Sequence, residues 1–92
     1  MISREQAFEV ASGAIKNGNI VGVYSTEGNV FNSPALQYIL NTLHNSDGSR
    51  EECWVAYIDD GHRFSGLRSS QIVVVKQSDG AIVYMGSAVD EG

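Results

Sequence analysis

Few side chains in this sequence have both the type and the spacing that chemistry requires. Asp59, Asp60 and His62 place two carboxylates and an imidazole within four residues, and such ligands suit divalent cations. A calcium loop needs several more acids and a closing glutamate, and none follows. A zinc site needs a further ligand within reach. We therefore expect a solvated turn at a strand end, with no metal and no cofactor.

The single cysteine, Cys53, is the other candidate for chemistry. One cysteine cannot form an intramolecular disulfide, and a thiol needs a nearby base such as His44 or His62 to act as a nucleophile. No spacing in the chain brings these groups together. Cys53 also lies within a strand pattern, where a buried thiol behaves as a small apolar side chain. We expect a protein without enzymatic activity.

The chain is short and acidic, and both properties limit its function. Its 92 residues, 42% of them apolar, predict a single domain over residues 1–92 with one modest core. The net charge of −5 and the six scattered basic residues argue against binding to nucleic acids or anionic membranes. No apolar run has the length of a membrane span. The N-terminal segment lacks the pattern of a signal peptide, so we expect a cytoplasmic location.

Two segments carry the signals of helices. The first starts at a capping box made by Ser3 and Gln6, continues with an apolar stripe, and is expected to end at Gly18. The second has Ser33 as its cap and Pro34 as its first helical residue, followed by leucines at helical spacing.

The remaining sequence predicts strands. One covers residues 20–25, another lies in "EECWVAYIDDG", and "QIVVVKQSDGAIVYMG" forms a hairpin with Asp79 and Gly80 in its turn. Within the second strand, Trp54 and Tyr57 should point to opposite faces. The predicted order is α-β-α-β-β-β, an α+β protein in which two helices pack on a small, mostly antiparallel sheet. The last three strands should form an antiparallel meander.

The sheet requires burial on both faces, because its strands carry continuous apolar runs instead of alternating apolar and polar residues. Either the two helices cover opposite faces, or one face meets another protein.

A surface for a partner is predicted on the sheet and its surrounding loops. The candidate aromatic residues are Trp54, Tyr57, Phe64 and Tyr84. A tryptophan in a central strand is more often a core anchor, whereas a tyrosine can show its hydroxyl at the surface. The candidate acidic rim consists of Asp59, Asp60, Asp90 and Glu91. Such a rim would steer a basic partner toward the surface.

Three segments resemble a known pattern. "SREQAFEVASGAI", "CWVAYID" and "IVVVKQSDGAIVYMG" resemble the small cystatin-like α+β proteins, including PepSY-type domains and YrhB-type bacterial immunity proteins. The resemblance implies a non-enzymatic module that binds or inhibits a protein, and it carries over no catalytic residues.

Two hypotheses follow for the function. The first is a bacterial-type, protein-binding module, in the manner of an immunity or inhibitor protein with a basic partner. The alternative is a homodimeric domain that binds a small ligand and uses an open sheet face for self-association.

Overall fold

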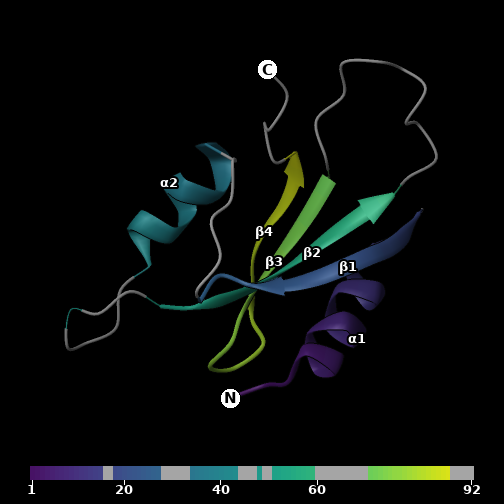
Figure 1. Ribbon diagram of the computed structural model, residues 1–92, viewed down its shortest axis with the longest axis horizontal. Helices are drawn as coiled ribbons and strands as arrows, with labels where there is room; N and C mark the ends of the chain where they lie inside the picture. Colours follow the sequence, from purple (N-terminus) through teal and green to yellow (C-terminus); the bar gives the residue numbers. More distant parts are fainter. Residues whose placement is uncertain (16–17, 28–33, 44–47, 49–50, 60–70, 88–92) are drawn as a thin grey trace.

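One antiparallel sheet with two helices forms the described part of the protein (Figure 1). The computed structural model describes residues 1–15, 18–27, 34–43, 48, 51–59 and 71–87. The elements follow in the order α1 (Arg4–Ala14), β1 (Asn19–Ser25), α2 (Pro34–Thr42), β2 (Cys53–Asp59), β3 (Gln71–Lys76) and β4 (Ile82–Ser87). The predicted α+β class is confirmed, whereas the resemblance to cystatin-like proteins stays a prediction.

The sheet has the simplest possible connectivity. Its strands lie in the order β1-β2-β3-β4, and each neighbouring pair is antiparallel, so the predicted meander is extended by β1. The register shifts once in each edge strand, at Val21 in β1 and at Val83 in β4. Such bulges bend and twist the strand that carries them.

Helix α1 covers one face of the sheet by close approach of small side chains. Ala7 and Ala11 are fully buried against β1, β2 and β3, because a methyl group lets the helix backbone lie near the sheet. The predicted capping box is present: the Gln6 N–H donates to Ser3 Oγ (3.1 Å), and the Ser3 N–H donates to Gln6 Oε1 (2.8 Å).

The end of α1 differs from the prediction. The helix stops at Ala14 with Ile15 as its C-cap, so Gly18 is not the cap. Ile15 takes an extended conformation while its N–H still donates to the Ala11 carbonyl (3.2 Å), and its side chain packs against the core beneath α1. Gly18 instead supplies a positive φ of 94° directly before β1, where glycine is favoured.

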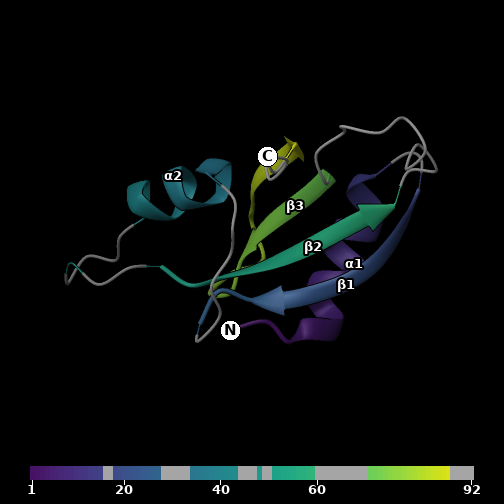
Figure 2. The ribbon, with the colours of Figure 1, turned by 45° about the horizontal axis from the view of Figure 1, so that its top comes forward.

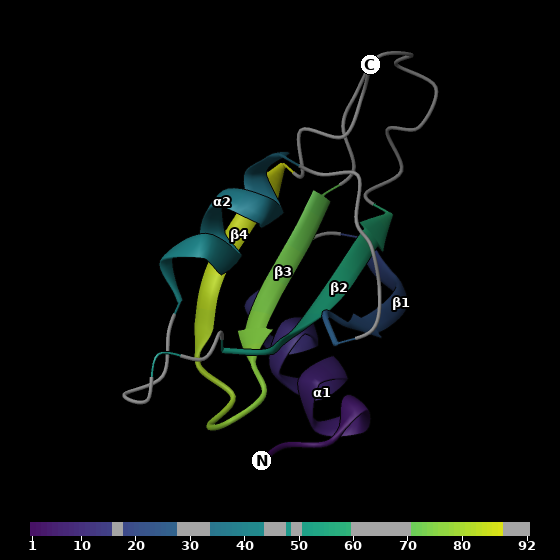
Figure 3. The same cartoon turned by 60° about the vertical axis from the view of Figure 1, so that its left-hand side comes forward.

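Helix α2 covers the other face of the sheet, and Figures 2 and 3 show the two helices on opposite sides. Leu36 and Leu40 are buried in a second apolar cluster with the side chains of Cys53, Val55, Ile72 and Val74. The predicted cap Ser33 lies outside the described residues. Of the two arrangements that the apolar strands allowed, the structure has the one with helices on opposite faces.

The predicted turn of the β3–β4 hairpin is at the expected place. Gly80 has a φ of 78°, and the Gly80 N–H donates to the Lys76 carbonyl (2.9 Å). The Lys76 N–H donates to the Ala81 carbonyl (2.8 Å), which closes the loop.

Candidate functional site

The two helices are offset toward opposite edges of the sheet, so each leaves one edge strand uncovered. Helix α1 contacts β1, β2 and β3, and the exposed side chains of Ile82 and Met85 lie on its side of β4. Helix α2 contacts β4, and on its side of β1 the side chain of Tyr24 is 48% exposed. Near Tyr24, where α2 does not cover β1, lie two of the three tyrosines described below.

Two cross-strand rows build this side of the sheet, because residues directly opposite in an antiparallel ladder share a face. The first row is Tyr24–Val55–Val74–Tyr84. The second row is Gly22–Tyr57–Ile72–Gly86. Each end of the first row is therefore a tyrosine, and each end of the second row is a glycine.

The two terminal tyrosines lean over the two glycines. A Cβ atom added to Gly22 would lie 2.6 Å from Tyr24 Oη, and one added to Gly86 would lie 3.3 Å from Tyr84 Oη. The Tyr24 ring also meets Tyr57 edge to face, with centroids 5.8 Å apart and an interplanar angle of 71°. We call Tyr24, Tyr57 and Tyr84 the tyrosine face. The position of the Tyr24 ring depends on the absence of a side chain at Gly22.

A carboxylate stands beside the tyrosine face. Asp59 follows Tyr57 by two residues in β2, and alternate residues of a strand point to the same face. Asp59 pairs with Asn19 at the end of the β1–β2 ladder. Three of the predicted partner-binding residues therefore share one face of the sheet, Tyr57 and Asp59 on β2 and Tyr84 on β4, the strand that α2 contacts.

Trp54 is not part of this group. Its side chain points to the α1 side of the sheet, packs against the core there, and donates from Nε1 to the Ile2 carbonyl (3.2 Å). The predicted alternation of Trp54 and Tyr57 is confirmed, and it separates the two residues onto opposite faces. Trp54 therefore holds the backbone at Ile2, just before α1, and acts as a core anchor.

Asp60, Phe64, Asp90 and Glu91 lie outside the described residues. Their roles stay predictions.

The described residues contain little that suits catalysis or metal binding. Cys53 is fully buried in the α2-side core, and both candidate bases, His44 and His62, lie outside the described ranges. Within those ranges, no group of three or more histidine, cysteine, aspartate or glutamate side chains has the arrangement of a metal site. In the same ranges, neither helix has the length and apolar character needed to cross a membrane.

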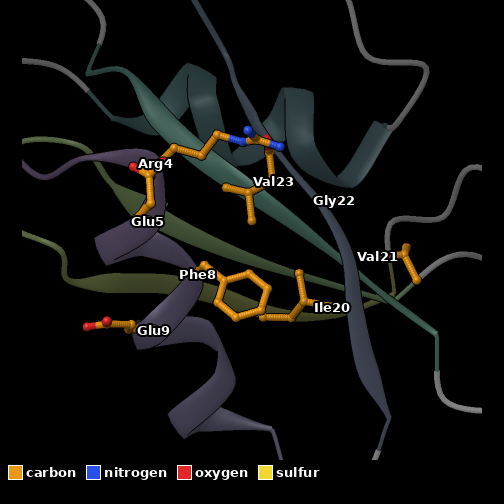
Figure 4. Close-up of a pocket in the computed structure, with 8 residues that line it drawn as sticks. All are labelled: Arg4, Glu5, Phe8, Glu9, Ile20, Val21, Gly22 and Val23. Atoms are coloured by element: carbon orange, nitrogen blue, oxygen red, sulfur yellow. The ribbon is translucent and has the colours of Figure 1, made fainter.

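A groove lies on the other side of the same edge strand, between α1 and β1 (Figure 4). Its volume is about 480 Å³, and Phe8 and Ile20 point toward each other within it. At one end Arg4 Nε donates to the Val23 carbonyl (2.9 Å). We call this feature the α1–β1 groove.

Sequence reasoning missed both Tyr24 and the groove. The apolar spacing of the first helix includes Phe8 and so predicts its burial, but its side chain is 46% exposed because it lies at the flank of the helix, above β1. A usable signal for the tyrosine face is a glycine two residues from a tyrosine in each edge strand, Gly22 before Tyr24 and Gly86 after Tyr84.

Comparison of the chain with protein-family models, with curated proteins and with solved structures finds no match in any of the three. The tyrosine face and the α1–β1 groove are the features on which a function is proposed.

Proposed function

We propose that the protein is a small cytoplasmic, non-enzymatic module that binds a basic protein partner through the tyrosine face. The observation that supports this most is the half-exposed Tyr24 ring, held against Tyr57 at the corner that α2 leaves uncovered. Tyrosine provides a large contact area with few rotatable bonds, and it is enriched among the residues that dominate binding energies.

The basic character of the partner follows from charge and ring chemistry. Tyrosine rings attract guanidinium and ammonium groups at their faces. Asp59 adds a carboxylate on the same side of the sheet, and the whole chain has a net charge of −5. These features favour a partner that presents arginine or lysine side chains, and they increase its rate of association.

Within this proposal, the role is that of an immunity or inhibitor protein whose target is a basic protein such as a nuclease toxin. The acidic charge supports that role, as does the resemblance of the helix, the tryptophan-bearing strand and the hairpin to small immunity proteins. Such a protein works by occupying a surface and needs no catalytic group.

The test compares the proteins captured from the source organism by three immobilised forms: wild type, Tyr24→Ser and Tyr38→Ser. Tyr38 is a matched control, because its side chain is 73% exposed on α2 and away from the tyrosine face. We expect a basic protein that the wild type and Tyr38→Ser retain equally, and that Tyr24→Ser binds about ten-fold more weakly.

Urea unfolding of each form shows whether it is folded under the conditions of capture. If all three folded forms retain the same proteins in the same amounts, the proposed function is wrong.

A further inference from the structure

The outer edge of β1 directs backbone hydrogen-bonding groups away from the sheet. Among the described residues, β1 pairs with β2 alone. The Thr26 N–H donates to the Cys53 carbonyl (2.9 Å), so the alternation of an antiparallel ladder directs the backbone groups of Tyr24 toward β2 and those of Val23 and Ser25 away from it. The hydrogen bond from Arg4 to the Val23 carbonyl agrees with this outward direction.

The regular part of this edge is short. The bulge at Val21 interrupts the ladder between Ile20 and Gly22, and bulges oppose the pairing of edge strands. Residues 22–25 stay in regular register with β2. We call them the edge segment, and an added strand would pair along it.

The two sides of the edge segment differ in chemistry. On the α1 side is the groove with the apolar side chains of Phe8 and Ile20. On the α2 side are Tyr24 and, farther along the face, Asp59. Because side chains of an added strand alternate between the two sides, its apolar residues would enter the groove and its basic residues would lie against the tyrosine face.

A second copy of this chain fits the edge poorly. Antiparallel pairing of two β1 strands places both α1 helices on the same face of the joined sheet. Glu5, which lines the groove, would then lie on the same face as Glu5 of the other copy. Each chain also has a net charge of −5, so the two copies repel each other.

We infer that the partner contributes an extended segment of alternating apolar and basic residues, which adds antiparallel to the edge segment of β1. This inference rests on the proposed function, since the occupant is a segment of the protein partner. Strand addition gives affinity through main-chain hydrogen bonds and specificity through alternate side chains.

Arg4 controls access to this edge. Its Nε–H occupies the Val23 carbonyl, which the N–H of an added strand must take over. Arg4→Met keeps much of the aliphatic stem and removes the competing donor together with a positive charge near the basic segment. The variant should therefore bind the segment about three- to ten-fold more tightly than the wild type.

The probe is the synthetic peptide acetyl-Arg-Val-Arg-Val-Arg-Val-Arg-amide, titrated into the isotope-labelled full chain and followed by NMR. We expect saturable shifts in the amide signals of the edge segment and of Phe8. In the proposed antiparallel register the valine N–H groups face β1 and the arginine N–H groups face away. N-methylation of the valines should weaken binding about ten-fold, and N-methylation of the arginines should change it little.

Protein variants test the groove. Phe8→Ala should weaken peptide binding about ten-fold, whereas the control Tyr38→Ala, on α2, should leave it unchanged. Equal affinities of the three peptides, or shifts that avoid the edge segment at millimolar peptide, would overturn the inference. Sedimentation of the free protein as a dimer, with the edge segment protected from hydrogen exchange, would also overturn it by assigning the edge to a second copy.

The two proposals fail separately. If the peptide does not add to β1 but Tyr24→Ser still loses the captured partner, the proposed function stands and the strand addition is wrong. If the peptide adds to β1 but no captured protein depends on Tyr24, strand addition stands and the proposed surface is wrong.

Discussion

At the scale of single residues, Thr26 ties the end of β1 to β2. Its side chain is 2% exposed, Oγ1 donates to Glu52 Oε2 (2.6 Å), and the same oxygen accepts the Cys53 N–H (2.8 Å). Gln77 completes the cluster by donating from Nε2 to the Cys53 carbonyl (3.1 Å). Every link joins groups that are far apart in sequence, so neither their partners nor their burial could be predicted from local patterns.

We predict that Thr26→Val lowers the free energy of unfolding by about 1–3 kcal/mol. The valine has nearly the same shape, but it leaves the buried Cys53 N–H without its acceptor and the Glu52 carboxylate without the hydroxyl donor. Thr26→Ser keeps the hydroxyl and should cost less. Urea denaturation measures both, and equal stabilities of Thr26→Val and the wild type would contradict this role.

Asp79 gives the turn of the β3–β4 hairpin a dependence on pH. The Ala81 N–H donates to Asp79 Oδ1 (3.0 Å) and lowers the pKa of this carboxyl below its usual value of 3.8. Lys76 Nζ, 3.7 Å from the other carboxylate oxygen, lowers the pKa further. Because the folded-state pKa is below the unfolded one, the stabilisation is present above pH 3.8 and is lost as the pH falls through the lowered value.

Asp79→Asn should therefore flatten the decrease of stability below pH 3.8. Near neutral pH it should lower stability slightly, because the amide oxygen still accepts the Ala81 N–H but the ion pair with Lys76 is lost. Urea midpoints measured across the acid range check this expectation. A variant whose acid profile matches that of the wild type would show that Asp79 does not contribute to it.

At the scale of elements, local sequence patterns predicted the features that depend on neighbouring residues. The capping box at Ser3, the start of α2 at Pro34 and the turn at Gly80 were all predicted, because each depends on neighbouring residues. The prediction that α1 ends at Gly18 was wrong, because Ile15 leaves the helix and packs against the core, which is a tertiary effect. The exposure of Tyr24 depends on β1 being an edge strand, and strand order is set by long-range pairing.

Two glycine substitutions separate the stability of α1 from the geometry of β1. A Cβ atom at Gly13 meets nothing within 4 Å, so Gly13→Ala should stabilise the protein by about 0.5–1 kcal/mol through helix propensity and leave partner binding unchanged. A Cβ atom at Gly22 would lie 2.6 Å from Tyr24 Oη, so Gly22→Ala should move the ring away from Tyr57.

We therefore expect Gly22→Ala to weaken binding of the captured partner about as much as Tyr24→Ser does, with Tyr24 itself unchanged. Affinity measurements on Gly13→Ala and Gly22→Ala test the expected effects on binding, and thermal unfolding of both variants tests the expected effect on stability. Full partner affinity in Gly22→Ala would show that the position of the Tyr24 ring is unimportant.

At the scale of the whole molecule, we expect the excess of acidic groups to attract the proposed basic partner over a distance. The predicted rim contains four of these groups, Asp59, Asp60, Asp90 and Glu91, and the net charge of the chain is −5. Changing the four to asparagine or glutamine should lower the association rate by about ten-fold at low salt and reduce its salt dependence. In concentrated salt the wild type and the variant should associate with the partner at similar rates. Identical rates at low salt would contradict steering by this rim.

The central claim, that the tyrosine face is where the partner binds, is tested most directly by mapping the interface in solution. The isotope-labelled chain is titrated with the captured partner, and the perturbation of each amide signal is measured by NMR. We predict the largest perturbations at Tyr24, Tyr57 and Asp59. Perturbations centred on the outer surface of α2 around Tyr38, with the signals of Tyr24 and Tyr57 unchanged, would contradict the claim.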